Sequence, residues 1–187
     1  MPKIKTSATA VALGMFCASM ANAADFGLSS PNVKDGGTIP EEQVANVFGC
    51  ASRNISPALA WKDAPAATKS FALTLYDLDA PTGSGFWHWV VFNIPATATS
   101  LPKNAGNPTA NLMPAGAVQG RTDFGVPGYG GPCPRPKDKP HHYRFTLFAL
   151  DIDKINGVDA NTPAAVIGFN LHFHTLATAR IVATYGR

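Results

Sequence analysis

The 187-residue sequence has few charged residues: Asp, Glu, Lys and Arg make up 14% of the chain, against about a quarter in average globular proteins. This shortage excludes a coiled coil, an array of helical repeats and a charge-rich disordered protein. Glycine and proline are abundant, with 17 and 16 residues, but they do not follow the collagen period. The composition therefore predicts a turn-rich, mainly β globular domain.

Long hydrophobic runs are also scarce. Residues 8–20 carry no charge but are too few to span a bilayer comfortably. Lys3 and Lys5 precede this run and Ala21-Asn22-Ala23 follows it, the pattern of a signal peptide with an A-x-A cleavage site. We expect residues 1–23 to be a signal peptide cleaved after Ala23, leaving one exported domain at residues 24–187, periplasmic or secreted, with no membrane span. The alternative is a buried N-terminal helix.

The formal net charge of +3 depends partly on this segment. Without Lys3 and Lys5, 13 basic residues remain against 12 acidic ones, a net charge of +1. No clustered basic stripe remains of the kind that binds a phosphate backbone. The sequence therefore predicts no nucleic-acid partner.

Only three cysteines occur, and one of them, Cys17, lies in the expected signal peptide. Cys50 and Cys133 remain as an even pair in an exported protein, which favours a disulfide between them. The alternative is two buried free thiols.

Four segments are rich in aromatic, β-branched and other apolar residues and are bounded by turn formers, which predicts strands at residues 70–76, 88–94, 143–150 and 180–185. Residues 88–94 are almost continuously apolar, as in a strand covered on both faces, whereas residues 143–150 alternate, as in a half-buried strand. Pro40 indicates one short helix, and Thr162, expected to act as the cap, indicates another. Residues 104–140 have no periodicity, and such a long loop is usually functional.

The residues able to carry chemistry follow these segments. Asp77 and Asp79 come directly after the first strand, His88 lies between two tryptophans, and His141-His142-Tyr143 opens the third strand. The loop at residues 129–134 offers glycine N–H groups for an anion. Each feature alone has a structural reading as well: the aspartates as turn caps, and the histidines as core residues.

Taken in order, these stretches resemble the phosphatidylethanolamine-binding protein family, in its bacterial Raf-kinase-inhibitor-like branch, over essentially all of residues 24–187. The matching segments are Gly49-Cys50, NISPALAW at 54–61, DLDAP at 77–81, WHWVVFNIP at 87–95, GRTDFGVPGYGGPCP at 120–134, HHYRFTLFALD at 141–151 and HTLATARIVATYGR at 174–187.

The resemblance implies a mainly β fold with a central antiparallel sheet, a smaller second sheet and a few short helices. It also implies a shallow pocket that binds phosphate-like or carboxylate anions. By position, the ligand-binding residues would be Asp77, His88, Gly131, Pro132, His141 and Tyr143. Asp79 would hold its own turn and His142 would point away. The resemblance also implies that Cys50 and Cys133 lie close together in the fold.

The function expected from this resemblance is that of a binding protein, an inhibitor or signalling modulator rather than an enzyme, with no cofactor and no metal. Its partner would be a small anionic ligand or a phosphorylated group, on a lipid headgroup or on a protein; the oligomeric state stays open, a homodimer included. One alternative is a hydrolase that uses Asp77, His88 and His141 as an acid–base set or a metal centre. Another is a carbohydrate-binding domain that uses Trp87 and Trp89.

Three further expectations follow from the residues. Asp77 would hold a histidine in one tautomer and raise its pKa, so that anions bind more tightly below about pH 7. The segment after Cys133 departs from the family pattern with Arg135, Lys137 and Lys139, which either steer anions or form a solvated loop. Residues 172 and 174, both histidines, could chelate a metal on a strand but not on a helix, where they lie about 200° apart.

Overall fold

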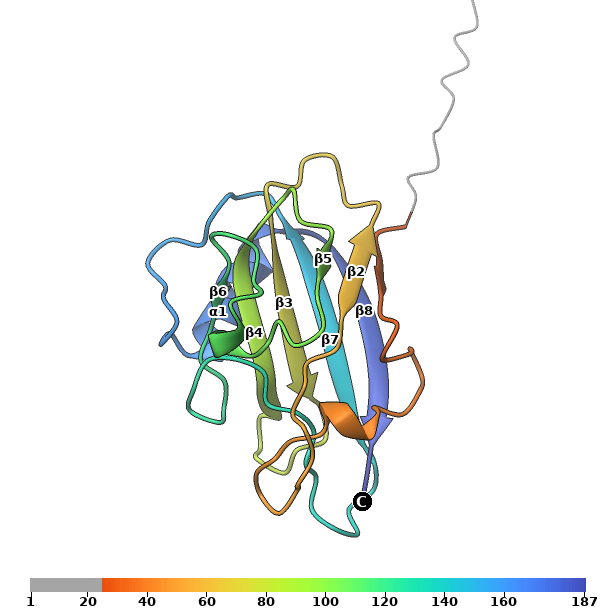
Figure 1. Ribbon diagram of the computed structural model, residues 1–187. Coiled ribbons are helices and arrows are strands. Elements are labelled where there is room, and N and C mark those ends of the chain that lie inside the picture. The colour runs from red at the N-terminus through yellow and green to blue at the C-terminus, as the bar shows by residue number, and fades with distance from the viewer. Residues whose placement is uncertain (1–24) are drawn as a thin grey trace, which may run out of the picture.

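The computed structural model describes residues 25–187, and the expected signal peptide lies outside these residues. Five strands form the larger antiparallel sheet in the order β6-β4-β3-β7-β8, and three form the smaller one in the order β1-β2-β5 (Figure 1). The larger sheet consists of β3 (Ser70–Asp77), β4 (Phe86–Pro95), β6 (Val118–Gln119), β7 (His141–Leu150) and β8 (Thr175–Tyr185); the smaller of β1 (Gly27–Ser29), β2 (Leu59–Lys62) and β5 (Ser100–Leu101). The prediction of a mainly β fold with two antiparallel sheets is confirmed.

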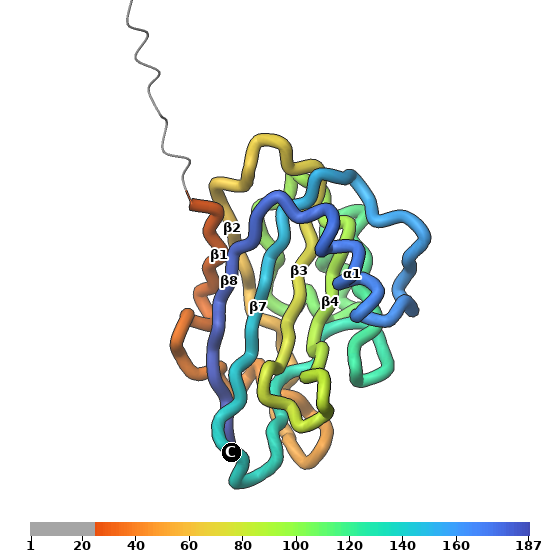
Figure 2. Tube along the Cα trace, turned by 180° about the vertical axis from the view of Figure 1, so that it is seen from behind, coloured from red at the N-terminus to blue at the C-terminus, as the bar shows by residue number. Residues whose placement is uncertain are grey.

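The larger sheet is covered on both faces. The smaller sheet packs on one face, where Leu59 and Trp61 of β2 join a core that includes Leu73, Trp89 and Phe145. On the other face, a second cluster lies under helix α1 (Ala164–His174), which lies on the side of the sheet that faces the viewer in Figure 2. This arrangement explains the continuous apolar run in β4, whose residues 88–92 are all buried.

Strand β7 is more buried than its alternating sequence predicts. Thr146 and Leu147, which point to opposite faces, are both buried, at 4% and 0% exposure. The expected alternation holds at Arg144 and Phe148, which are only partly buried, and fails at Thr146, because the sheet is packed on both faces there.

Helix α1 confirms the expected helix but not its cap. The Thr162 hydroxyl is engaged with Asp159, and the residue that precedes the helix, Pro163, makes no side-chain cap hydrogen bond. Because the helix continues to His174, His172 and His174 point in different directions, and His174 lies against Asp151 at 3.0 Å. No helix in residues 25–187 is long and apolar enough to cross a membrane.

The other expected helix, at Pro40, is a single 3₁₀ turn, η1 (Glu41–Gln43). The long aperiodic stretch at residues 104–140 contains a second 3₁₀ turn, η2 (Pro108–Ala110), and strand β6. It ends at the edge of the larger sheet where β7 begins, beside the C-terminus (Figure 1).

Candidate functional site

The candidate site lies at one end of the larger sheet, where the C-terminal end of β3 lies beside the N-terminal ends of β4 and β7. Because β3 runs antiparallel to both neighbours, its last residue is adjacent to the first residues of β4 and β7. Asp77 is paired with Phe86 on one side and with Tyr143 on the other. The strand register thus brings together residues that are more than 60 positions apart in the sequence.

A β-bulge turns His88 into the site. Leu75 pairs with Trp89 and Tyr76 pairs with Trp87, so His88 is the extra residue on β4. In a regular strand His88 would point to the face opposite Trp89. The bulge lets both side chains occupy the inner face, a device that commonly re-aims a side chain near functional sites.

The two carboxylate oxygens of Asp77 have different partners. Oδ1 accepts a hydrogen bond from the backbone N–H of Asp79 at 2.9 Å and thereby caps the turn after β3. Oδ2 lies 2.8 Å from Nδ1 of His141, which must be the donor because a carboxylate only accepts. Asp77 therefore performs both roles that its sequence position left open.

His88 is held neutral. Its Nδ1 donates to the carbonyl of Gly130 at 2.8 Å, which leaves Nε2 as an acceptor, 3.9 Å from Oδ2 of Asp77. Burial lowers the pKa of His88 below its ordinary value, more than the Gly130 carbonyl and the charge of Asp77 raise it. Asp77 thus acts on the pKa of His88 in the expected direction, but burial outweighs it, so the expected net rise is wrong for His88.

The hydroxyl of Tyr143 is buried and makes no hydrogen bond of regular geometry among residues 25–187, although it lies near enough to the Asp77 carboxylate for a contact with that group to raise its pKa. Its ring lies between the two histidines, with centroids 5.3 Å from His88 and 6.3 Å from His141. Burial, followed by the charge of Asp77, raises the pKa of Tyr143, so the group stays protonated. An unpartnered buried hydroxyl is costly, and this one faces a cavity.

That cavity has a volume of about 140 Å³. Its polar floor is formed by Asp77, His88, His141 and Tyr143, which are all 6% exposed or less. Its upper walls are largely apolar and are formed by Phe48, Ala80, Pro81, Phe86, Phe124, Cys133 and Pro134, with Thr82, Arg135 and Asp138. The site thus combines polar groups at its base with an aromatic rim.

Two of the expected binding residues, Gly131 and Pro132, do not line this cavity. The Gly131 N–H donates to Oδ1 of Asn54 at 2.7 Å and the Gly130 N–H to the carbonyl of His88 at 2.9 Å, so the glycine loop does not form the expected anion nest. The Pro132 carbonyl accepts from Ala45 at 3.0 Å. These residues support the wall of the cavity.

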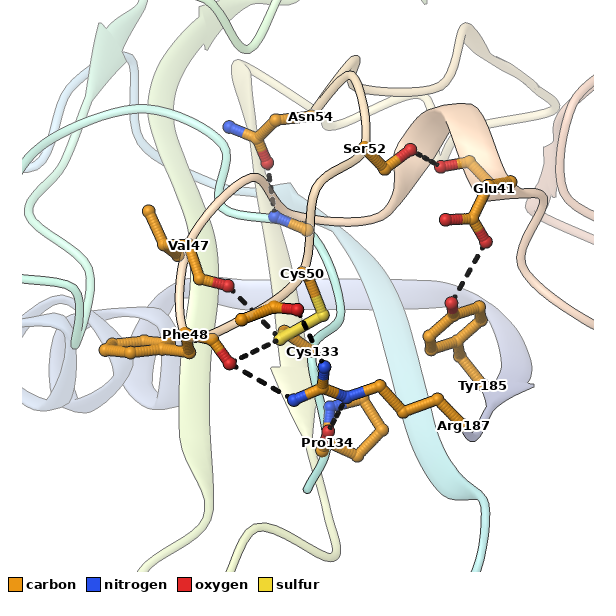
Figure 3. The surroundings of a disulfide bond; sticks show 12 residues. Glu41, Val47, Phe48, Cys50, Ser52, Asn54, Cys133, Pro134, Tyr185 and Arg187 are labelled. Atoms are coloured by element: carbon orange, nitrogen blue, oxygen red, sulfur yellow. Dashed lines mark hydrogen bonds between the residues drawn. A yellow bond between two sulfur atoms is a disulfide. The ribbon is translucent and has the colours of Figure 1, made fainter. Parts of the chain in front are cut away.

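A disulfide joins the two loops at the rim (Figure 3). Cys50 and Cys133 are bonded, with Cα atoms 6.0 Å apart, as the sequence predicted. Arg187 donates to the carbonyls of Pro134, Gly49 and Phe48. The backbone at Phe48, whose side chain is 69% exposed, is thereby held beside the cavity. Sequence reasoning missed the contribution of Phe48, which lies outside the matching segments, and of Arg187, which closes the last matching segment but carries no chemical pattern of its own.

The neighbouring histidine has a different role. His142 points away from the cavity, as expected, and both its backbone N–H and its Nδ1 bond to Oδ2 of Asp79. Asp79 therefore fastens the start of β7, in addition to lying in its own turn. No group of three or more His, Cys, Asp or Glu side chains within residues 25–187 is arranged to hold a metal ion.

The tryptophans beside His88 serve the core. Trp89 is fully buried and its Nε1–H donates to Gln119 at 3.0 Å. Trp87 lies on the other face, against Tyr76 at 4.4 Å between ring centroids. The two rings form no common surface for a sugar, so the structure argues against the carbohydrate-binding alternative.

The sequence matches known proteins over most of its length. The family model for phosphatidylethanolamine-binding protein matches residues 29–186. The chain belongs to this family. It is 49% identical over 170 residues to YbcL of Escherichia coli, covering 91% of this chain and 92% of YbcL, and 51% identical over 158 residues to YbhB of the same organism, covering 84% and 98%.

The solved structures of family members agree as well. The crystal structure of Escherichia coli YbcL, described as a member of the mammalian PEBP family, matches with a TM-score of 0.85 at 49% identity, over 88% of this chain and 99% of that one. A PEBP homologue from Chlamydia trachomatis, CT736, matches with a TM-score of 0.71 at 28% identity, over 87% and 97%. The resemblance inferred from the motifs is thus confirmed.

Proposed function

We propose that this member of the phosphatidylethanolamine-binding protein family binds a phosphate-like or carboxylate anion at the base of the cavity, as a binding protein and not as an enzyme. The observation that carries the proposal is the Tyr143 hydroxyl, which is buried and makes no hydrogen bond of regular geometry among the described residues. An anion oxygen at the base of the cavity would satisfy it. A buried hydroxyl that lacks a regular protein partner is explained where a bound ligand or ion completes its hydrogen bonding.

The surrounding groups fit the same ligand. His141 is oriented by Asp77 so that its Nε2 faces away from that carboxylate. The unprotonated Nε2 of His88 can accept from a hydroxyl of a protonated anion such as hydrogenphosphate. The aromatic rim, formed by Phe48, Phe86 and Phe124, offers apolar surface to the organic part of a larger molecule, such as a lipid headgroup with its glycerol or a phosphorylated side chain.

The cavity wall favours binding over hydrolysis. Its only sulfur atom belongs to Cys133, which is oxidised in the disulfide. Its threonine hydroxyl, on Thr82, donates to the carbonyl of Gly85 and is not directed by a base. A hydroxyl or thiol nucleophile must lie within reach of a general base, and neither Thr82 nor Cys133 meets this requirement.

We further propose that the protein is exported and acts outside the cytoplasm. The signal-peptide pattern at residues 1–23 supports this location, and the Cys50–Cys133 disulfide is of the kind that persists in oxidising compartments. An inhibitory or signalling role would then act on a phosphorylated molecule in that compartment. Detection of the mature N-terminus at Ala24 in an extracytoplasmic fraction would test the location.

Replacement of Tyr143 by Phe tests the binding site directly. It removes the unpartnered hydroxyl and nothing else, so the free energy of unfolding should stay within about 0.5 kcal/mol or rise. The affinity for inorganic phosphate, measured by calorimetry, should fall by about tenfold, because a hydrogen bond to a charged group contributes about 1.5–3 kcal/mol.

Tyr129 provides the matched control. Its hydroxyl is equally buried but donates to the carbonyl of Gln43 at 2.8 Å, away from the cavity. Tyr129→Phe should therefore lower stability by about 1–2 kcal/mol and leave phosphate affinity unchanged. Phosphate binding that is equal in wild type and Tyr143→Phe, or undetectable in the wild type, would refute the proposed function.

A further inference from the structure

The loop between the disulfide and β7 carries an ion pair into the mouth of the cavity. Its tip is a tight turn: the Asp138 N–H bonds to the Arg135 carbonyl at 3.2 Å, with Pro136 and Lys137 (φ 72°) at the centre. Proline at the second position and a positive φ at the third are typical of a type II turn. The Lys137 N–H donates to the carbonyl of Arg187 at 3.0 Å, so the turn is also fixed to the C-terminal residue.

The two side chains at the ends of this turn are bonded to one another. Nε and Nη2 of Arg135 lie 3.0 and 3.2 Å from Oδ2 and Oδ1 of Asp138, a bidentate arrangement. The hydrogen bond from Arg135 lowers the pKa of Asp138. Asp138 is therefore ionised, and both residues line the cavity.

Asp138 also faces the ring nitrogen of His141 that would meet a ligand. Its Oδ2 lies 3.7 Å from Nε2 of His141, while Nδ1 on the other side of the ring is bonded to Asp77. A carboxylate of the protein thus stands beside the position where the proposed anion would bind.

We infer that Asp138 is an internal competitor for the anion site, and that the ligand displaces it while Arg135 turns from Asp138 to the ligand. This inference rests on the proposed function and specifies its ligand. The Arg135 side chain is 74% exposed, and Asp138 is its only side-chain partner among the described residues, so it has room to reorient.

The competition sets a free-energy cost that every ligand must exceed. Exchanging the Asp138 carboxylate for a carboxylate ligand replaces one singly charged group by another and gains little. A phosphate monoester carries a charge of about −1.5 to −2 and three acceptor oxygens, which can accept from Tyr143 and Arg135, and also from Nε2 of His141 when both ring nitrogens carry protons. Because displacing Asp138 costs the same for either ligand, the site should prefer phosphate monoesters to simple carboxylates through these additional contacts.

Titration of inorganic phosphate and of acetate into wild type and Asp138→Asn tests the inference. At fixed pH and ionic strength, Asp138→Asn should bind phosphate about tenfold more tightly, a difference of 1.4 kcal/mol. Acetate should gain by at least a few-fold and no more than phosphate, because the cost of displacing Asp138 is the same for both ligands and the charge of phosphate is larger. Asp153→Asn is the matched control: Asp153 is exposed and lies past the opposite end of β7, and the same charge change there should leave both affinities at the wild-type level.

A second pair of variants separates the role of Arg135. If Arg135 turns to the ligand, Arg135→Ala combined with Asp138→Asn should bind phosphate about tenfold more weakly than Asp138→Asn alone. Equal affinities in these two variants would overturn the transfer of Arg135. Wild type that binds phosphate as tightly as Asp138→Asn would overturn the competition, whereas no phosphate binding by either protein would overturn the proposed function itself.

Discussion

Substitution of Gly131 by Ala should destabilise the protein even though its backbone conformation suits any residue. The Cβ of an alanine there would overlap the carbonyl oxygen of Gln43 and lie 2.7 Å from the backbone nitrogen of Ala45. Both neighbours are backbone atoms, which cannot rotate away as a side chain can. The loop that carries Gly131 must therefore separate from the segment at residues 43–45.

The cost can be assembled from the contacts at that point. Overpacking of a tight site typically costs about 1–3 kcal/mol. Separation would also break two hydrogen bonds, from Gly131 to Asn54 and from Ala45 to Pro132, each contributing about 0.5–1.5 kcal/mol. With part of the strain relaxed, we expect a loss of about 2–4 kcal/mol, and a midpoint of thermal unfolding lowered by about 5–15 °C at this chain length.

The assay is urea and thermal unfolding of wild type, Gly131→Ala and Gly168→Ala. Gly168 lies in α1 with no atom within 4 Å of an added Cβ and without a positive φ. Alanine there should raise stability by about 0.5–1 kcal/mol, as expected for glycine in a helix interior. If Gly131→Ala unfolds within about 0.5 kcal/mol of wild type, the loop does not pack as described, and Gly131 regains its place as a candidate ligand-binding residue.

Two further predictions concern the disulfide and the buried histidine. Replacing Cys50 and Cys133, which are 83 positions apart, by Ala should lower the free energy of unfolding by about 4 kcal/mol; urea unfolding that is identical with and without the pair would contradict this. The lowered pKa of His88 means that below about pH 6.5 the unfolded chain takes up a proton that the folded protein does not. Stability should therefore fall as the pH drops through that range, by up to about 1.4 kcal/mol per pH unit, and His88→Gln should remove this component; parallel pH profiles would show that His88 is not buried neutral.

Much of the fold could be read from the sequence because its signals are local. The strands at residues 70–76 and 88–94 are marked by apolar runs between turn formers, and both lie within the observed β3 and β4. The burial of both faces of β7 could not be read in the same way. Whether Thr146 is covered depends on which elements pack on the sheet, and its own sequence does not carry that information.

The candidate site also has residues that the sequence identified and residues whose placement depends on the fold. Asp77, His141 and Tyr143 stand at the ends of predicted strands, but it was the family resemblance that assigned them to one site; antiparallel pairing shows why these ends meet. The orientation of His88 depends on a bulge that has no marker in the sequence. The glycine loop was misplaced because a free N–H cannot be told from one bonded to Asn54 without the fold.

The loop at residues 134–139 shows why its charges cannot be interpreted one at a time. From the sequence, Arg135, Lys137 and Lys139 suggest a basic mouth that attracts anions. In the folded protein Arg135 is neutralised by Asp138, and the acidic partner faces the histidine at the base of the site. The electrostatic potential at the cavity mouth depends on this pairing. If Asp138 pointed to solvent, Arg135, Lys137 and Lys139 would leave the mouth positively charged. When Asp138 points inward, its carboxylate opposes the entry of an anion. Anion affinity should accordingly depend more on the direction of one carboxylate than on the net charge of the loop.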